Sequence, residues 1–583
     1  MTRSETHVRW RDKSQFAILT RHFFSRFFDN EFVAPGGEMM FSITQILAVL
    51  AVPGAFFAIW AFSKYPFLIA RSTSAAAVDS WGDRCFFVSF SMIVMGLVTV
   101  VEWDSLFPDR RDYQNLLALP LRVRTFFTAK IASLFLFMTL FSITINSASG
   151  VFFPFAATMQ KTSFGFLVRF LIGHFVAVNL AGAFVFFFLV ALQGFFIAVL
   201  PHRLFQKVSV LIQSTLLVLL LSVFLVLGQL IGKVKQSDNI VYDLLFAPAW
   251  FTTLYDRILR IPSIHTSLPW TLALAAFGLA FTLSLLFYAI AYRKHVTRLL
   301  DANTAATDRF SPASALVSLF RRAFVRHPFE LAAFDFVIFT VSRSRKHRMV
   351  VGSALGVGIA FSLAWLFGLL AAKGIAGLYQ LNLTMLMIPP TLTFMLVGGL
   401  RFAFNLPVEL RSNWIFRLSD QAEYAQFWRG VRKALILIVV VPLYLAAFLS
   451  YGFCWGWPTA LGCGLIALIE ALLLMEWLFR DFPKIPFACS YLPGKGNLKS
   501  RWPVYIVSFS LYVFFSGLLQ GSFLGNPTRY SAAVLIGMFL VWRMNRRRER
   551  FLKARFVPVY EDLPDPPFLL LGVGSLRLKP EPE

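Results

Sequence analysis

Five ionisable residues lie within or beside long apolar stretches of the sequence, where a charge is costly to bury. They are Glu102, Arg169, His174, Glu470 and Glu476. Such residues can relay protons in proton-coupled carriers, which makes them candidates for transport chemistry. Glu476 lies close to one end of its apolar stretch, and Arg169 is near enough to the surface for its side chain to reach water. Only His174 and Glu470 are therefore expected deep in the apolar region.

Other kinds of chemistry find little support in the sequence. A phosphate-binding loop requires the pattern G-x-x-x-x-G-K-[ST]. The nearest string is LPGKGNLKSRW, residues 492–502, where Leu498 replaces the glycine before Lys499. The four cysteines form no C-x-x-C pair and have no metal-ligand spacing. We therefore expect no catalytic, cofactor-binding or metal-binding residues in this chain.

The composition predicts which elements must position these groups. The chain is 57% hydrophobic, has 67 phenylalanines and only 15% charged residues, and its mean hydropathy is +0.67. These values exclude an ordinary soluble domain. The net charge of +25 does not accompany a folded basic surface of the kind that binds nucleic acid, so we expect no nucleic-acid partner.

Apolar stretches long enough to cross a bilayer recur along the whole chain, since a spanning helix needs about 20 mainly apolar residues. The sequence thus predicts an all-α polytopic protein of the cell membrane, with the lipid bilayer as its surroundings. The twelve predicted spans are 41–62, 86–101, 131–153, 166–199, 208–232, 269–291, 349–371, 383–400, 434–451, 459–477, 504–521 and 531–542.

The distribution of positive charge predicts the orientation of these spans, because lysine and arginine are enriched in cytoplasmic loops. With both termini inside, 44 of the 55 lysines and arginines fall in inward segments and ten in outward loops. This asymmetry favours an even number of spans and two cytoplasmic termini.

A long basic segment separates six spans from six, which indicates two pseudo-repeated halves. Equivalent inner segments follow the second span of each half, and such a duplication places a pathway between the halves. The predicted regions are a cytoplasmic N-terminus with an amphipathic helix (1–40), a first six-span half (41–292), a basic linker with a second such helix (293–348), a second six-span half (349–545) and a disordered cytoplasmic tail (546–583).

The segment after the second span, DRRDYQNLLALP, has the pattern of a short cytoplasmic helix. Asp109 suits the positive end of the helix dipole. Tyr113, Leu116 and Leu117 follow at helical spacing and form an apolar ridge, which Pro120 ends. Such a ridge could dock into a cleft of a soluble partner, whereas a plain solvated loop remains the alternative reading. The charged rim of the ridge consists of Arg110, Arg111 and Asp112.

Two further features recur in both halves. The segment after the eighth span, RFAFNLPVELRSNWIF, also contains Leu-Pro and a mixture of charged and aromatic residues. Before the first span, DKSQFAILTRHFFSRFF places Phe16, Leu19, Phe23 and Phe27 on one helical face, as expected for a helix lying in the membrane interface. The segment HPFELAAFDFVIFTVSRSRKHR before the seventh span matches it more loosely.

This arrangement resembles the permeases of ATP-binding-cassette (ABC) exporters of the type 2 class. In that family each half has an elbow helix before the first span, a coupling helix after the second, and a partly re-entrant segment between the fifth and sixth. DKSQFAILTRHFFSRFF, PDRRDYQNLLALP and VYDLLFAPAWFTTLYDRILRIPS (241–263) occupy those places in the first half. The last outward loop, 522–530, departs from the pattern because it is too short for a re-entrant helix pair.

The resemblance implies the membrane subunit of an ATP-driven exporter that works by alternating access. Separate cytoplasmic ABC ATPase subunits would use the ATP, and this chain would be neither an enzyme nor a cofactor-binding protein. The helix of residues 10–28 would brace the inner surface, and 241–263 would form part of the outer gate. The transported substrate is not indicated. The residues implied in coupling to the ATPase are Asp109, Arg110, Arg111, Asp112, Tyr113, Leu116, Leu117, Glu409, Arg411, Trp414 and Arg417.

Two alternatives stay open. A proton-coupled twelve-span carrier of the major-facilitator type also has an Asp-Arg pair after its second span. The glycines of its G-x-x-x-D-R-x-G-R-[RK] pattern are missing around Asp109 and Arg110. A membrane-embedded lipid-linked transferase would need clustered acids or a nucleophile with a base, and the short outward loops offer none.

Overall fold

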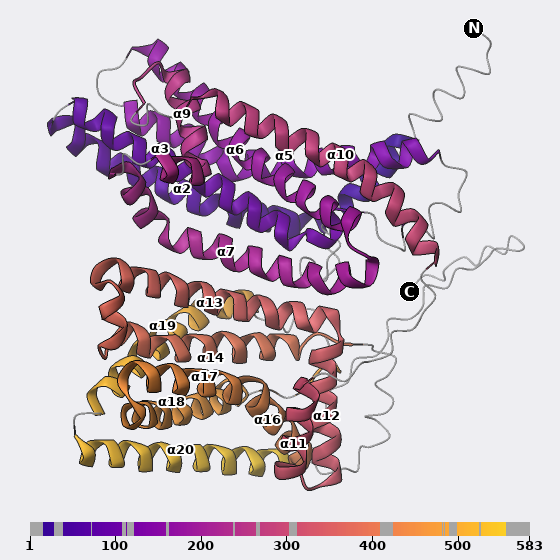
Figure 1. Cartoon of the computed structure of the whole chain (residues 1–583), viewed down its shortest axis with the longest axis vertical. Coiled ribbons are helices and arrows are strands. Elements are labelled where there is room, and N and C mark those ends of the chain that lie inside the picture. The colour runs from indigo at the N-terminus through magenta and orange to yellow at the C-terminus, as the bar shows by residue number, and fades with distance from the viewer. Residues whose placement is uncertain are drawn as a thin grey trace, which may run out of the picture.

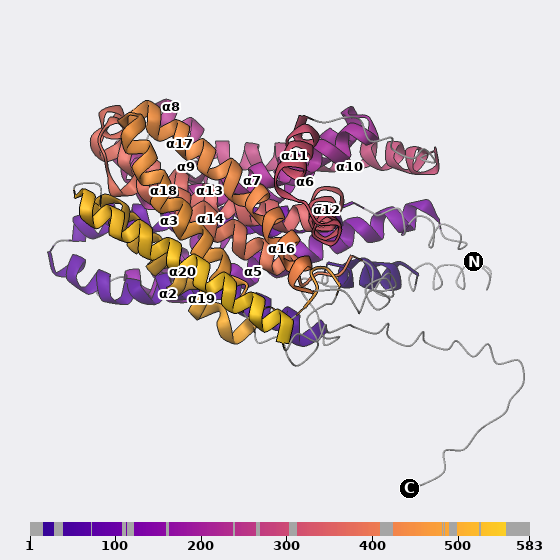
Figure 2. The ribbon, with the colours of Figure 1, turned by 90° about the horizontal axis from the view of Figure 1, so that it is seen from below.

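The structure is a computed structural model of the chain. Among its described residues, helices account for nearly every element and no strand occurs. The long helices run side by side in one bundle, as two orthogonal views show (Figures 1 and 2). The described residues are 15–27, 39–71, 73–107, 112, 122–158, 163–236, 240–263, 269–301, 312–408, 424–480, 482, 484–488, 498–523 and 526–554.

The first half is built from long helices of 29 to 36 residues, rich in Phe, Leu, Val and Ala. At 1.5 Å per residue, each is longer than the hydrocarbon core of a bilayer, which is about 30 Å thick. These helices are α2 (Met39–Arg71), α3 (Thr73–Val101), α5 (Val123–Thr158), α6 (Phe164–Val199), α7 (His202–Gln236) and α10 (Thr271–Asp301).

The second half repeats this plan with one local irregularity. A π-helical turn, η4 (Ile436–Val440), joins two α-helices immediately before Pro442, because the proline cannot donate a backbone hydrogen bond into the preceding turn. The long elements are α13 (Arg345–Lys373), α14 (Leu383–Ala403), α16 (Tyr424–Leu435) continued through η4 by α17 (Val441–Trp455), α18 (Trp457–Leu478), α19 (Leu498–Phe523) and α20 (Pro527–Ala554).

Ten described helices are long and apolar enough to cross a membrane. They cover the predicted second to eleventh spans, except for the first two residues of the sixth, so a polytopic membrane protein is confirmed. The second begins earlier than predicted, at Ser80. The first predicted span lies in α2, whose shorter apolar part is Leu50–Tyr65. The twelfth lies in α20, which carries many arginines and continues to Ala554, inside the segment predicted as the tail.

Shorter helices occupy the places where the sequence predicted accessory elements. Residues 15–25 form a helix before α2, and α11 (Pro312–Phe324) with α12 (Pro328–Arg343) precede α13. The segment 241–263 forms α8 (Ile240–Leu245) and α9 (Ala247–Leu259). In Figure 1, α11 and α12 lie at one end of the bundle and α9 toward the other.

The two halves share a packing pattern. In each, the second long helix packs against the fourth and the fifth, and the fourth packs against the third and the sixth. The first long helix breaks the repeat: α2 packs mainly on α5, whereas α13 packs on α14 and on α7 of the other half. The main contact between the halves is therefore the pair α7 and α13, which adjoin in Figure 1.

Close approach of α7 and α13 is favoured by Gly356 of α13, and Gly352 marks a second contact about one turn away. A Cβ atom built on Gly352 would lie 3.6 Å from Ser214 Oγ, and one on Gly356 would lie 3.1 Å from Val218 Cγ2. Because both contacts advance along both helices together, α7 and α13 run parallel. Lys233 Nζ, 4.9 Å from the centre of the Phe367 ring, extends the contact toward the ends of the two helices.

Candidate functional site

The helix of residues 15–25 is fastened to the predicted coupling segment through Asp112. Arg26, directly after that helix, donates a hydrogen bond from Nη1 to Asp112 Oδ1. The Asp112 side chain is buried, whereas Arg26 is about one-third exposed. A charge-assisted hydrogen bond of this kind joins two segments that are 86 residues apart in the sequence.

A buried lysine anchors the same helix to α5 and to the turn that follows α3. Lys130 Nζ of α5 lies 5.2 Å from the Phe23 ring centre and 4.7 Å from that of Phe27. It donates a hydrogen bond to the Ser105 carbonyl oxygen at 2.8 Å. Glu102, just beyond the end of the candidate span in α3, lies close enough for its charge to interact with that of Lys130.

Glu102 itself is 7% exposed. Burial raises the pKa of its carboxyl group to about 7, although a hydrogen bond with Ser105 and the positive charge of Lys130 act in the opposite direction. The carboxyl group therefore changes charge near neutral pH, at the junction of α3, α5 and the helix of residues 15–25.

The other predicted coupling residues lie outside the described residues. They are Asp109, Arg110, Arg111, Tyr113, Leu116 and Leu117 in the first half, and Glu409, Arg411, Trp414 and Arg417 in the second.

The start of the second coupling segment is held in place by a backbone exchange. Phe487 donates from its N–H to the Phe404 carbonyl oxygen at 2.9 Å, and Val408 donates to the Phe487 carbonyl oxygen at 3.2 Å. His347 Nε2 lies 2.9 Å from the Leu406 carbonyl oxygen. The chain beyond α14 is thus tied to α13 and to the segment that follows α18.

Ion pairs join three helices of the second half, α12, α16 and α18. Glu330 of α12 binds Lys433 Nζ at 2.5 Å and lies 3.6 Å from Arg429, both on α16. Glu476 of α18 binds Arg432 of α16 at 2.7 Å. Glu476 is therefore part of a structural network rather than a lone buried acid.

His174 is fully buried where three elements of the first half meet. Its Nδ1 is 3.1 Å from the Tyr255 hydroxyl of α9, and its Nε2 is 3.4 Å from Ser149 Oγ of α5. Gly173 next to it lets the Tyr255 ring approach, since a Cβ atom there would lie 3.0 Å from that ring. The imidazole thus fixes α9 against α6 and α5.

A buried ion pair adds to this contact, and sequence reasoning missed it. Arg84 Nη2 of α3 lies 2.8 Å from Asp256 Oδ1 of α9, with side chains that are 3% and 1% exposed. Arg84 also donates to Ser80 Oγ at 2.8 Å, and its guanidinium lies 5.6 Å from the Tyr255 ring centre. The signal was hidden because the predicted second span began at residue 86, which left Arg84 in an outward loop.

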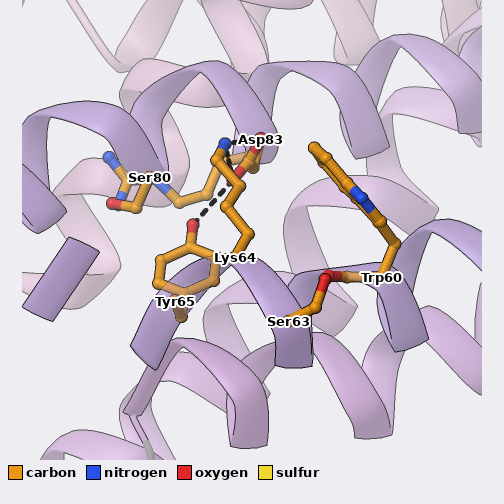
Figure 3. A network of polar contacts seen from close by, with 7 residues as sticks. Trp60, Ser63, Lys64, Tyr65, Ser80 and Asp83 are labelled. Carbon is orange, nitrogen blue, oxygen red and sulfur yellow. Dashed lines mark hydrogen bonds and ion pairs between the residues drawn. The ribbon is translucent and has the colours of Figure 1, made fainter. Parts of the chain in front are cut away.

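The neighbouring residue Asp83 pairs with α2 (Figure 3). Lys64 Nζ donates to both carboxylate oxygens of Asp83 at 2.8 Å, and the Tyr65 hydroxyl donates to Oδ2 at 2.9 Å. The consecutive residues Asp83 and Arg84 therefore bind opposite neighbours, one on α2 and one on α9. Together they fix the end of α3 that lies near α9.

In the second half, Glu470 of α18 faces α19. Its Oε2 accepts hydrogen bonds from Ser516 Oγ and from Gln520 Nε2, the latter at 3.0 Å. His174 and Glu470, the two residues predicted to lie deep, belong to different halves and share no partner among these bonds. The described residues contain no group of three or more His, Cys, Asp or Glu that could hold a metal ion.

Comparison with models of protein families, with curated proteins and with solved structures gives no significant match for this chain.

Proposed function

We propose that this chain is the membrane-spanning subunit of an ATP-driven exporter of the type 2 ABC class. It has two six-span halves in one polypeptide and two cytoplasmic termini, in the cell membrane. Separate cytoplasmic ATPase subunits hydrolyse ATP, and their closure moves the two halves between inward-open and outward-open arrangements. Such a machine requires a membrane domain with two states whose equilibrium the partner biases.

The observation that carries the proposal is the fastening of the inner segment after α3. Asp112 lies in the segment that would meet an ATPase, and it is bonded to Arg26 of the elbow region. That region in turn packs on Lys130 of α5. A displacement of residues 109–119 would therefore be transmitted to α3 through the backbone, and to α5 through the contacts of the elbow region.

The opposite end of the first half supports a gate built from α8 and α9. Arg84–Asp256 and His174–Tyr255 bind α9 to α3 and α6, so movement of these helices would carry α9 with them. In the second half, α19 ends at Phe523 and α20 begins at Pro527. The gate would therefore be asymmetric and built mainly by the first half.

The test is purification of the tagged full-length chain from native membranes in a mild detergent. An ABC ATPase should copurify in a fixed ratio, with ATP hydrolysis that vanadate inhibits. Changing Arg110 and Arg111 together to Glu should release the ATPase or uncouple its activity.

A matched control reverses two charges outside the predicted coupling segments, one at the C-terminal end of α13 and one at the N-terminal end of α20. Lys373 and Arg529 are both exposed, and their joint change to Glu should leave the ATPase bound. Purification without any ATPase, or equal behaviour of the two double variants, would contradict the proposal.

A proton-coupled carrier remains the second candidate because Glu470 is an acid in the apolar interior of α18 and α19. In that case transport would follow an imposed proton gradient without ATP, and Glu470→Gln would abolish it. ATP-dependent transport that survives Glu470→Gln would exclude this candidate.

A further inference from the structure

An apolar groove runs along the second half between α18 and α19. Its volume is about 420 Å³. Several of its wall residues are about half exposed at the surface of the helix bundle, where a bilayer would contact them. The groove is therefore open toward lipid. Its apolar lining includes Phe394, Leu473, Trp477, Leu511, Phe515 and Leu519.

The polar part of the groove is formed by Glu470, Tyr512 and Ser516. Glu470 Oε2 already accepts two hydrogen bonds, from Ser516 Oγ and Gln520 Nε2. Gln520 Nε2 also donates to Ser516 Oγ at 3.0 Å. The opposite amide orientation would place the Gln520 oxygen beside the carboxylate, so these bonds define the orientation of that side chain.

Three buried polar atoms here have no partner among the described residues. They are Glu470 Oε1 and the Tyr512 hydroxyl, whose residues line the groove, and Gln520 Oε1, which belongs to a fully buried side chain outside the groove lining. When Glu470 is ionised its Oε1 is an acceptor, and the Tyr512 hydroxyl can also accept. Unsatisfied acceptors in an apolar setting are costly, and the cost is relieved by a ligand that brings donors.

The required ligand combines an apolar chain with a donor-rich head. A protonated primary amine supplies three N–H donors and a charge opposite to that of the carboxylate. An alkyl chain would contact the rings and leucines of the groove walls. An alcohol brings one donor and no charge, and a carboxylate head would be repelled.

The depth of Glu470 agrees with entry from the bilayer. Glu470 lies eight residues before Leu478, where α18 ends, which corresponds to about 12 Å along the helix. Trp477 and Ser508 line the groove near that end. An amphiphile could thus enter between α18 and α19 and bring its head to Glu470.

We propose that the groove between α18 and α19 is a binding site for amphiphiles with a protonated amine head and an alkyl chain, held through Glu470. The site requires neither ATP nor a partner protein. Its failure can therefore be distinguished from failure of the proposed exporter function, which the copurification experiment tests separately.

The experiment uses the full-length chain in phosphatidylcholine nanodiscs, whose choline heads have no N–H donors. A dodecylamine analogue bearing a photoreactive diazirine is the probe, and labelled peptides are mapped by mass spectrometry. Labels should lie on α18 and α19. Free dodecylamine should compete at least about tenfold better than dodecanol, because a hydrogen bond between charged groups is worth more than a neutral one.

Three variants separate the site from general effects. Glu470→Gln should lose the preference for the amine over dodecanol. Leu511→Trp, at an exposed wall position, should reduce labelling by filling the groove while leaving Glu470 intact. Glu549→Gln removes a carboxylate near the end of α20, where it pairs with Arg429, and should label like the unmodified chain.

Equal competition by dodecylamine and dodecanol in the unmodified chain would overturn the proposal. So would full labelling of the Leu511→Trp variant, which also provides a test if the Glu470 variant fails to fold. Labels confined to helices other than α18 and α19 would likewise place the amine elsewhere.

Discussion

Replacing one partner of the Arg84–Asp256 pair should loosen α9 far more than replacing both. The two side chains are 3% and 1% exposed and their charged atoms are 2.8 Å apart. Arg84→Met or Asp256→Leu alone would leave an unpaired buried charge, at a cost of about 3–5 kcal/mol. The double variant removes both charges, so neither is left unpaired.

The double variant should still have a lower free energy of unfolding than the unmodified chain, because it loses two contacts of Arg84. It loses the hydrogen bond from Arg84 to Ser80 and the contact of Arg84 with the Tyr255 ring. These contacts are worth about 1 kcal/mol each. The two single effects should therefore sum to about 3 kcal/mol or more above the double effect, which a double-mutant cycle measures directly.

Cysteine labelling provides the assay. Cys85 is fully buried next to Arg84, and Cys463 is fully buried in the other half. If labelling follows local opening, a loss of about 3 kcal/mol accelerates modification of Cys85 about 100-fold. Cys463 should react at an unchanged rate, because α18 belongs to the other half.

The refuting results are specific. Unchanged labelling of Cys85 in both single variants would mean that the ion pair does not hold α9. Additive single effects in the double variant would mean that the two charges do not interact. Equal acceleration at Cys463 would indicate global unfolding rather than local release.

Three further results are expected. Arg26→Met should lower the local stability of the helix of residues 15–25 by about 1 kcal/mol, because the pair of Arg26 with Asp112 is partly exposed. Amide hydrogen exchange in residues 15–25 should then be about fivefold faster, and unchanged exchange would contradict this prediction. The folded-state pKa of Glu102 is raised to about 7 from 4.5, so as the pH rises the unfolded chain releases this proton before the folded chain does. The free energy of unfolding should therefore fall as the pH rises from 4.5 to 7, by at most about 3 kcal/mol. Glu102→Gln should remove that slope in thermal denaturation, and an unchanged slope would assign it to another group. The double variant Ser214→Cys with Gly352→Cys should form a disulfide between α7 and α13 under mild oxidation, and neither single variant should. Absence of the disulfide in the double variant would indicate a different arrangement of the halves.

The helices were predictable because hydropathy alone defines most of them. Ten of the twelve predicted spans coincide with candidate membrane helices. The twelfth span and the start of the second differ from the prediction for clear reasons. α20 joins an apolar segment to a run of arginines, so its composition lies between a spanning helix and a surface helix. The predicted second span was too short because Asp83 and Arg84 interrupt the apolar run, although both are paired within the bundle.

For the buried polar residues, the sequence predicted their depth but not their hydrogen-bond partners. The depth of His174 and Glu470 follows from their distance to the nearest loops, and the structure buries His174 fully. Their partners do not follow from the sequence, since Ser516 lies 46 residues from Glu470 and Tyr255 lies 81 residues from His174. Local periodicity carries no information on which helices become neighbours in space.

The contact between α7 and α13 has a mechanical consequence. Two parallel rods that touch along one line can roll over each other easily, but they resist sliding where side chains interlock. Here Leu217 and Val218 rest against Gly356 and oppose sliding. Rolling would open a wedge on one flank of the contact line while closing the other. We therefore expect the lowest-energy motion of the molecule to be a rotation of one half against the other about the line of contact between α7 and α13.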